Sequence, residues 1–219
     1  MVQKSRLIVA LDVYDGEQAL KLAKTLESQV FAFKVNWPII LGNGSGIIGK
    51  LSKYSRVLCD FKIADIPNTN RLITRKAREE GAWGIISHIF NGRDSFSSVV
   101  EEAGHEMKVF SVSTMSHPGF ADFMKPRFRE MVETSLSLGA SGIIVPGNDY
   151  TLIGEVRKLA GEKLLLATGI GAQNGKAGLS VKAGADYVIV GRSIYESSDP
   201  LSAAQGINSE ISLVISARP

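Results

Sequence analysis

The charged residues best placed to do chemistry together are Lys34, Asp60, Lys62 and Asp65. Asp60 and Lys62 are two residues apart at the end of a β-branched run, and Asp65 follows just beyond it. Side chains alternate between the two faces of a strand, so Asp60 and Lys62 are expected to point to the same side. Lys34 ends the preceding β-branched run, which would place a second ammonium group beside the carboxylates.

Alternating positive and negative charges allow all four groups to stay ionised, because each charge has opposite neighbours. A lysine held between carboxylates keeps its proton, so Lys62 is predicted to donate a proton or to stabilise negative charge rather than to form a Schiff base. This favours protonation of a carbanion over aldolase chemistry. The alternative is a structural ion-pair network, but several charges at one strand end are costly to desolvate, which favours a functional site.

The elements that must position these residues appear as a repeated pattern of short apolar runs. Eight runs recur at spacings of roughly twenty to thirty residues, as a strand-plus-helix repeat requires. We expect strands over Leu7–Leu11, Val30–Val35, Arg56–Phe61, Trp83–Ser87, Lys108–Val112, Gly142–Val145, Lys163–Ala167 and Tyr187–Val190.

The segments between these runs have the apolar periodicity of amphipathic helices. A Gly-Ala pair follows three of the segments, and a glycine at that position can adopt the left-handed conformation that ends a helix. Pro67 suits the first turn of a helix. The clearest helices are expected over Glu17–Ser28, Asn68–Glu80 and Phe123–Leu138.

Apolar strands that alternate with amphipathic helices predict a parallel sheet covered by helices. Eight such units predict closure into a (β/α)8 barrel, the TIM-barrel fold. No low-complexity linker or change of composition divides the chain, so residues 1–219 are expected to form a single barrel domain. A doubly wound open sheet is the alternative, but it would usually have fewer strands.

Bulk properties exclude several classes of protein. The 219 residues suit one large domain, and 44% hydrophobic with 21% charged residues is ordinary for a globular chain. A net charge of +3 does not by itself suggest a nucleic-acid binder. The single cysteine, Cys59, permits no internal disulfide, which fits a reducing cytoplasm. The N-terminal apolar run is too short for a signal peptide, and no stretch is long enough to span a bilayer. We therefore expect a cytoplasmic protein that binds neither nucleic acid nor membrane.

The loops after the last two strands are predicted to bind phosphate, as those loops often do in such barrels. Strand seven is followed by the glycine-rich segment 169–173, and strand eight by Gly191 and Arg192. Glycines let backbone N–H groups approach phosphate oxygens, and an arginine adds a bidentate cation. The glycines could instead serve tight turns only. Because both expected loops carry the pattern, we predict a phosphorylated small-molecule substrate. The three scattered histidines and one cysteine predict no metal site.

These segments together resemble the orotidine 5′-monophosphate decarboxylase family, in its compact archaeal form. The resemblance covers nearly the whole chain, in the family's order. The Asp-x-Lys-x-x-Asp element alone is shared with hexulose-phosphate synthases and keto-gulonate-phosphate decarboxylases, and the Ser-His-Pro-Gly and Gly-Ala-Gln segments separate the two groups. The matching segments are Ala10-Leu11-Asp12, Lys34, Asp60-x-Lys62-x-x-Asp65-Ile66, Ser116-His117-Pro118-Gly119, Gly169-Ile170-Gly171-Ala172-Gln173 and Val190-Gly191-Arg192-Ser193.

The resemblance implies an enzyme that converts orotidine 5′-monophosphate to uridine 5′-monophosphate in de novo pyrimidine synthesis. The C6 carboxylate would leave as carbon dioxide, without metal or organic cofactor. Lys62 would protonate C6 and stabilise the carbanion-like transition state. Asp60 would lie against the departing carboxylate, and Lys34 would hold Asp60 and contact the ribose.

The resemblance also implies how the nucleotide is bound. Asp12 would bind a ribose hydroxyl, and Ser116 would contact the amide edge of the pyrimidine. Gln173 would bridge the base and the phosphate. The amide of Gly191 and the guanidinium of Arg192 would hold the phosphate.

A homodimer is a further implication of the resemblance. Asp65, together with Ile66 and Thr69, would reach into the site of the partner copy.

The chain departs from the family pattern at a few positions. Thr168 stands where a proline is usual, and Asn174 where a glycine is common. Asn36-Trp37 replaces the more familiar Gly-Tyr after Lys34. None of these changes removes a chemical group that the implied reaction uses.

Two other functions remain open at this point. The first is a metal-dependent lyase of the hexulose-phosphate synthase type, in which carboxylates would hold Mg²⁺. The second is a catalytically silent barrel that binds nucleotides as a regulator. A pure binding protein would not need Lys62, so the intact charge array favours an enzyme.

Overall fold

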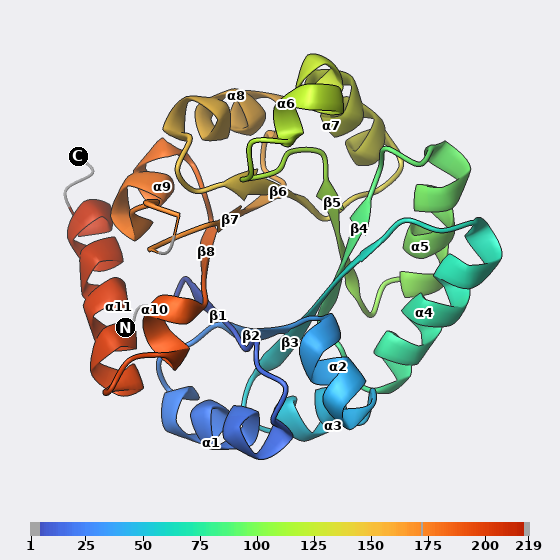
Figure 1. Ribbon diagram of the computed structural model, residues 1–219. Coiled ribbons are helices and arrows are strands. Elements are labelled where there is room, and N and C mark those ends of the chain that lie inside the picture. The colour runs from blue at the N-terminus through green and yellow to red at the C-terminus, as the bar shows by residue number, and fades with distance from the viewer. Residues whose placement is uncertain (1–4, 172, 217–219) are drawn as a thin grey trace.

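Eight parallel strands close into a barrel in the computed structural model, which describes residues 5–171 and 173–216. Each strand pairs with the next along the chain, and β1 pairs with β8 (Figure 1). Helices follow the strands and form the outer ring, so the predicted (β/α)8 barrel is confirmed.

The described strands lie close to the predicted runs. They are β1 Leu7–Ala10, β2 Ala32–Val35, β3 Arg56–Ile63, β4 Gly84–His88, β5 Lys108–Val112, β6 Gly142–Pro146, β7 Leu164–Thr168 and β8 Tyr187–Val190. The described helices are α1 Gly16–Leu26, α2 Trp37–Asn43, α3 Ile47–Leu51, α4 Pro67–Glu79, α5 Arg93–Ala103, α6 Phe120–Phe123, the 3₁₀ turn η1 Lys125–Arg127, α7 Phe128–Ser137, α8 Tyr150–Ala160, α9 Ala177–Ala183, α10 Arg192–Tyr195 and α11 Pro200–Ser216. None of these helices is long and apolar enough to cross a membrane.

Strand alternation divides the buried apolar residues into two cores. One set fills the barrel and includes Ile8, Leu58 and Phe110. The residues that precede or follow these on the strands, such as Leu7 and Val57, face the surrounding helices. The inner core therefore forms an apolar floor beneath the mouth of the barrel.

One predicted helix, over 123–138, is wrong at its start, in residues 123–127. The segment 123–138 is not continuous, because α6 ends at Phe123, a 3₁₀ turn covers Lys125–Arg127, and α7 begins only at Phe128. Pro126 explains the break, since proline has no N–H to donate and its ring clashes with the preceding turn of an α-helix. The apolar spacing persists across the break and gave no sign of it.

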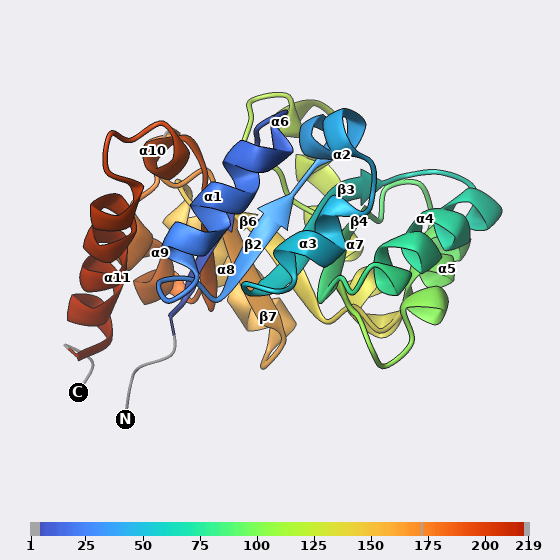
Figure 2. The same ribbon diagram turned by 90° about the horizontal axis from the view of Figure 1, so that it is seen from below.

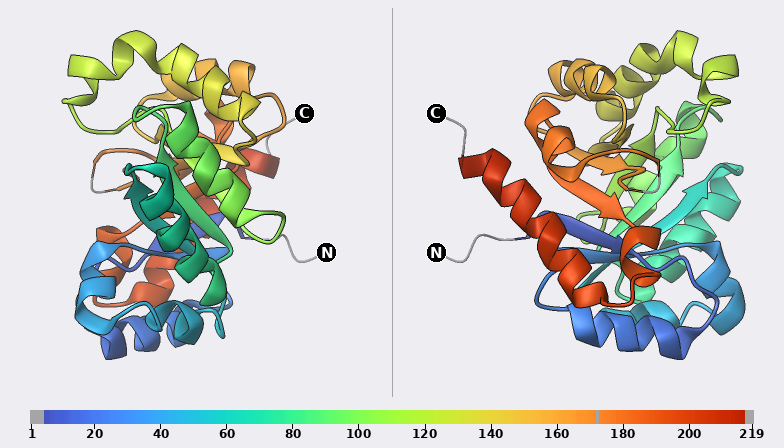
Figure 3. Two further views of the ribbon diagram at one scale, coloured as in Figure 1. Left: turned by 90° about the vertical axis from the view of Figure 1, so that its right-hand side faces the viewer. Right: turned by 60° about the vertical axis from the view of Figure 1, so that its left-hand side comes forward.

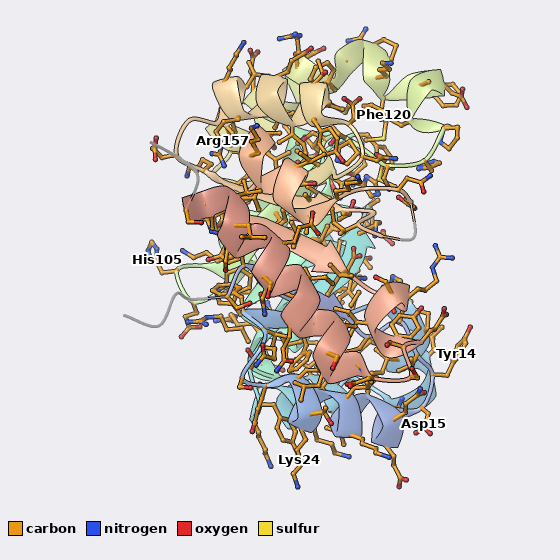
Figure 4. The ribbon with its side chains drawn as sticks, turned by 90° about the vertical axis from the view of Figure 1, so that its left-hand side faces the viewer. Tyr14, Asp15, Lys24, His105, Phe120 and Arg157 are labelled. Carbon is orange, nitrogen blue, oxygen red and sulfur yellow. The ribbon has the colours of Figure 1, made fainter. Side chains whose placement is uncertain are left out.

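The site-bearing end of the barrel is the end at which the strands finish. Figure 2 shows α2, α6 and α10 at that end, while the last turn of α11 lies toward the opposite end. Tyr14, which follows β1, and Phe120, which follows β5, lie on the same side in Figure 4, and His105, which precedes β5, lies on the other. The right-hand view of Figure 3 shows α11 along the outside of the barrel, where it contacts α9 and β1.

Replacing Gly142 by alanine is predicted to destabilise the barrel by about 1–3 kcal/mol, because a Cβ there would overlap the backbone carbonyl of Leu164 on β7. Gly206→Ala is the control, since nothing lies within 4 Å of a Cβ at that position in α11. That change should stabilise the chain by about 0.5–1 kcal/mol, through helix propensity. Urea unfolding midpoints test both changes, and equal midpoints for the Gly142 variant and the parent chain would contradict the packing argument.

Stability is predicted to fall as the pH drops below about 6.5, because His88 must remain neutral in the fold. Burial, together with the positive charge of Lys62 and against the weaker effect of Asp60, lowers the pKa of His88 to about 4. Its Nδ1 atom is buried without a hydrogen-bond partner. The unfolded chain therefore binds this proton more readily, so the stabilisation is complete above about pH 6.5 and is lost toward pH 4.

The measurement is the free energy of unfolding from pH 7 down to pH 4 for the parent chain, His88→Gln and the exposed control His105→Gln. The parent and the His105 variant should lose more stability than the His88 variant over this range, by up to about 3 kcal/mol. Parallel curves for all three proteins would rule out this role for His88.

Candidate active site

A pocket of about 360 Å³ opens at the C-terminal mouth of the barrel, within the size range of small-molecule sites. It collects residues from all eight strands or the loops that follow them. Eight of the predicted site residues line it, namely Asp12, Lys34, Asp60, Lys62, Ser116, Gln173, Gly191 and Arg192.

A continuous chain of ion pairs crosses one wall of this pocket. The Nζ atom of Lys34 lies 3.0 Å from Oδ1 of Asp12 and 3.0 Å from Oδ2 of Asp60. The other Asp60 oxygen accepts a hydrogen bond of 2.7 Å from Nζ of Lys62. Lys34 and Asp60 are 5% and 7% exposed, whereas the Lys62 side chain is 41% exposed. The predicted meeting of Lys34, Asp60 and Lys62 is therefore confirmed, and Asp12 extends it.

The two buried members of the chain are held ionised by their neighbours. Burial would lower the pKa of Lys34, but the carboxylates of Asp60 and Asp12 outweigh it and the pKa is raised. Burial would likewise raise the pKa of Asp60, but the ammonium groups of Lys34 and Lys62 outweigh it and the pKa is lowered. Asp60 contributes stability that is lost as the pH falls through its lowered pKa, and Lys34 contributes stability that is lost as the pH rises through its raised pKa. The pair is thus intact at neutral pH.

The strand that carries Asp60 and Lys62 is distorted at its end. The pairing of β3 with β4 shifts register between Cys59 and Ile63. Lys62 has a φ of 45°, which a residue with a side chain adopts only at a cost of about 1–3 kcal/mol. Such strain persists where the surrounding structure imposes it, and it concentrates at functional sites. Lys62 is therefore held in place by its surroundings and not by regular strand geometry.

Trp37 is one source of this constraint. Its Nε1 atom donates a hydrogen bond of 3.0 Å to the carbonyl of Phe61, and the two rings stack with centroids 4.9 Å apart. The departure from Gly-Tyr at this point of the family pattern thus fastens α2 to the residue that precedes Lys62. Asn36, the other departure, lines the pocket and has a buried Oδ1 without a hydrogen-bond partner.

The loop after β7 is a tight turn built on left-handed residues. Gly169 and Gly171 have φ of 80° and 73°, and Asn174 has φ of 64°. Asparagine is among the few residues other than glycine that adopt this conformation, so Asn174 replaces a glycine without loss of the turn. Gln173 accepts a hydrogen bond of 3.2 Å from Asn148 at its carbonyl. Ala172 of the same segment lies outside the described residues.

The loop after β8 completes this side of the pocket. Gly191 approaches β1 closely, since a Cβ there would lie 3.4 Å from Cβ of Ala10 and 3.6 Å from an oxygen of Asp12. Arg192 follows at the start of α10 and is exposed. Gln173 after β7 and Gly191 with Arg192 after β8 thus line the pocket, together with Lys34 of β2 and Asp60 with Lys62 of β3.

Three predicted residues do not line the pocket. Asp65 and Ile66 lie in the connection between β3 and α4, and Thr69 is in the first turn of α4. The Asp65 carboxylate accepts a hydrogen bond of 2.7 Å from the N–H of Ile66 and is exposed. Within the part of the chain that the structure describes, it forms no ion pair.

The sequence placed several residues of the pocket wall at the strand ends, but gave them no role in the site. Asn36 follows Lys34 by two positions, Thr114 follows Val112, and Thr168 follows Leu166, so each shares the inward face of its strand. That spacing was the signal that could have identified them. The apolar floor, which comes from the inner core, is formed by Ala10, Ile86, Ile144 and Ile189. Among residues 5–171 and 173–216, no three His, Cys, Asp or Glu side chains gather into a group that could hold a metal ion.

Comparison with known proteins gives a consistent match over the whole barrel. Residues 5–207 match the model of the "Orotidine 5′-phosphate decarboxylase / HUMPS family". The orotidine 5′-phosphate decarboxylase of Thermoplasma acidophilum is 51% identical over 214 residues, covering 98% of this chain and 99% of its own length. That of Methanosarcina acetivorans is 46% identical, covering 96% of both chains.

Solved structures agree with the sequence relatives. The crystal structure of the Pyrococcus horikoshii orotidine 5′-phosphate decarboxylase has a TM-score of 0.87 at 45% identity, covering 94% of this chain and 99% of that one. The Methanocaldococcus jannaschii enzyme, complexed with the inhibitor BMP, has a TM-score of 0.89 at 34% identity, covering 95% and 99%. With the family match and the relatives above, these likenesses show that the chain belongs to the orotidine 5′-phosphate decarboxylase / HUMPS family.

Proposed function

We propose that the chain decarboxylates orotidine 5′-monophosphate to uridine 5′-monophosphate in pyrimidine synthesis, with no metal or organic cofactor. The observation that carries this proposal is the buried Asp60 carboxylate, bonded to both Lys34 and Lys62 at the mouth of the pocket. Its support from relatives is that proteins named orotidine 5′-phosphate decarboxylase are up to 51% identical over nearly the whole chain.

The proposed reaction needs only one proton from the protein. The bond between C6 and the carboxylate breaks, carbon dioxide leaves, and the electron pair stays on C6. The Lys62 ammonium then transfers a proton to C6, which completes uridine 5′-monophosphate and leaves a neutral amine that regains its proton from water. The 2.7 Å contact with Asp60 supports this role, because it holds the Lys62 ammonium group at the wall of the pocket.

Asp60 would act on the other reacting group. A substrate carboxylate placed about 4 Å from Asp60 is repelled by roughly 4 kcal/mol at an effective dielectric constant near 20. If departure of carbon dioxide relieved all of it, the rate would rise by about three powers of ten. The rest must come from Lys62, which meets negative charge as it develops on C6 and so binds the transition state better than the substrate.

The remaining pocket residues are proposed to bind the nucleotide. Asp12 would accept a hydrogen bond from a ribose hydroxyl, and Ser116 would contact the pyrimidine. Gln173, the amide of Gly191 and the guanidinium of Arg192 would hold the phosphate. Their place after β7 and β8 supports this arrangement, because β7 is four strands away from β3, which carries Lys62, around the eight-stranded barrel.

We propose further that the working unit is a homodimer in which Asp65, Ile66 and Thr69 complete the partner's site. Two apolar side chains near that end of the barrel are exposed, Ile66 by 66% and Phe90 by 56%. Phe90 lines a second, more apolar groove of about 730 Å³ beside the pocket. Exposed apolar surface of this kind is typical of an interface between protein chains.

A direct assay tests the reaction. Loss of orotidine 5′-monophosphate absorbance should proceed at the same rate with and without a chelator, because the proposed steps use no metal. Lys62→Ala should lower kcat by about 1000-fold or more, since both the proton and the charge are lost.

Lys76→Ala is the matched control, because Lys76 forms an ion pair of the same length with Glu80 outside the pocket. It should keep the parent rate. Activity that disappears with the chelator would instead indicate the metal-dependent lyase, and full turnover by the Lys62 variant would disprove the mechanism.

Mixing two inactive variants tests the shared site. A dimer of one Asp65→Asn chain and one Lys62→Ala chain would contain one site with both native residues and one with neither. Equal amounts of the two chains, refolded together, should recover roughly a quarter of the parent activity, because random pairing puts half the chains into such dimers. No recovery, with both variants folded and paired, would show that each chain supplies its own Asp65.

A further inference from the structure

The turn that carries Asp65 is held by a buried polar cluster, formed by Asn70 of α4 and Ser95 of α5. The Asp65 N–H donates a hydrogen bond of 3.1 Å to Oδ1 of Asn70, and Nδ2 of Asn70 donates one of 3.0 Å back to the Asp65 carbonyl. The side-chain amide of Asn70 thus forms hydrogen bonds with both the N–H and the carbonyl of Asp65.

Ser95 joins the two helices to the same turn. Its hydroxyl donates a hydrogen bond of 2.7 Å to the Asp65 carbonyl and accepts one of 2.7 Å from Nδ2 of Asn70. Nδ2 of Asn70 also bonds to the Ser95 carbonyl, and Asn91 donates to the Asp65 carbonyl over 3.1 Å. Asn70 is fully buried and Ser95 is 3% exposed, so water cannot replace these bonds readily.

The pattern of bonds fits positioning better than helix capping. The residue before α4, Ile66, makes no side-chain cap, and Asn70 does not bond to the free N–H groups of the first turn. Three donors meet at the Asp65 carbonyl, while the Asp65 carboxylate is left exposed. The backbone of Asp65 is therefore fixed, and its charged group remains available.

The helices that supply the cluster are themselves joined. Figures 1 and 3 show α4 and α5 side by side on the outside of the barrel. Arg71 pairs with Glu101 over 3.0 Å, and Arg75 pairs with Glu102 over 2.9 Å, so the two helices form one support. Exposed pairs of this kind contribute little individually, but both join the same two helices.

We propose that Asn70 is a positioning residue that sets the location of the Asp65 carboxylate. This inference rests on the proposed function, in which Asp65 completes the site of a second copy. A carboxylate that must reach across an interface needs a fixed backbone position, because a misplacement of about 1 Å can cost about 100-fold in rate. Asn70 would fix the backbone of Asp65 in this position without contacting the substrate.

The test begins with Asn70→Ala, which should lower kcat by about 100-fold while the chain still folds and pairs. Asn208→Ala is the matched control. Asn208 also uses its side-chain amide to hold a distant loop, through a 2.8 Å bond from Nδ2 to the Gln29 carbonyl and a 3.0 Å bond accepted from Ser5. The control should lose stability but keep its kcat.

Mixed dimers then show which half of the site Asn70 serves. Paired with Lys62→Ala, the Asn70 variant contributes a native Lys62 to a site whose Asp65 comes from a chain with native Asn70. Roughly a quarter of the parent activity should return. Paired with Asp65→Asn, no site combines a native Lys62 with a correctly held Asp65, so activity should fall to about half that of the Asn70 variant and show no recovery.

The outcomes separate this inference from the proposed function. If Asp65→Asn with Lys62→Ala shows no recovery, the shared site itself is wrong. Asn70 does not position Asp65 if that pair recovers activity but the Asn70 variant is restored by both partners or by neither. The same conclusion follows if Asn70→Ala, measured without a partner variant, has the parent kcat. Should Asn70→Ala fail to fold, Ser95→Ala removes one donor from the Asp65 carbonyl and must show the same partner dependence.

Discussion

The Asp60 carboxylate, buried between two ammonium groups, is the interaction on which the rest of the site depends. An isolated charge with so little exposure would neutralise itself, yet Lys34 and Lys62 lower the pKa of Asp60 and keep it ionised. Removing one ammonium group would leave the buried Asp60 carboxylate with a single partner, and removing both would leave it uncompensated at a high cost in stability. The barrel tolerates the buried carboxylate because the ends of β2 and β3 bring one ammonium group to each of its two oxygens. The protein therefore holds an ionised carboxylate in a buried position at the wall of the pocket.

The alternation of side chains along a strand is the reason that this arrangement could be predicted from the sequence. Alternate residues of β3 face the helices at Val57, Cys59 and Phe61, while Leu58 faces the apolar interior. Asp60 and Lys62 continue the inward face above that floor. The same parity places Asn36 above Lys34, and Thr168 above Leu166. A polar ring on an apolar floor follows directly from eight strands that end at one level, and this is why both the fold and most of the pocket could be predicted from the sequence.

The rest depends on contacts that no local pattern records. The left-handed backbone at Lys62 and the bond from Trp37 to the Phe61 carbonyl require β3 and α2 to be packed together. The break before α7 had a visible cause in Pro126, but the apolar spacing around it continued undisturbed. The hold of Asn70 on Asp65 requires α4 and α5 to be adjacent, which the helical periodicity of either segment cannot reveal. Prediction therefore succeeded for what strand and helix periods determine. It failed where two elements meet and, at Pro126, where the apolar period continued across a helix breaker.

The charge array predicted from sequence alternates through Lys34, Asp60, Lys62 and Asp65, but one chain assembles only the first three. Asp12 extends the array at the Lys34 end, so the four groups that do meet have no net charge. Lys62, at the open end, has a carboxylate on one side only, and its side chain is the most exposed of the three. A neutral array with an open ammonium end is suited to receive one more negative group. With the proposed substrate bound, that group is the C6 carboxylate and then the charge it leaves on carbon. A carboxylate from a second copy would hold Lys62 from the far side. In the proposed dimer, the position of Asp65, and so of Asn70, would be part of the same electrostatic arrangement that begins at Asp60.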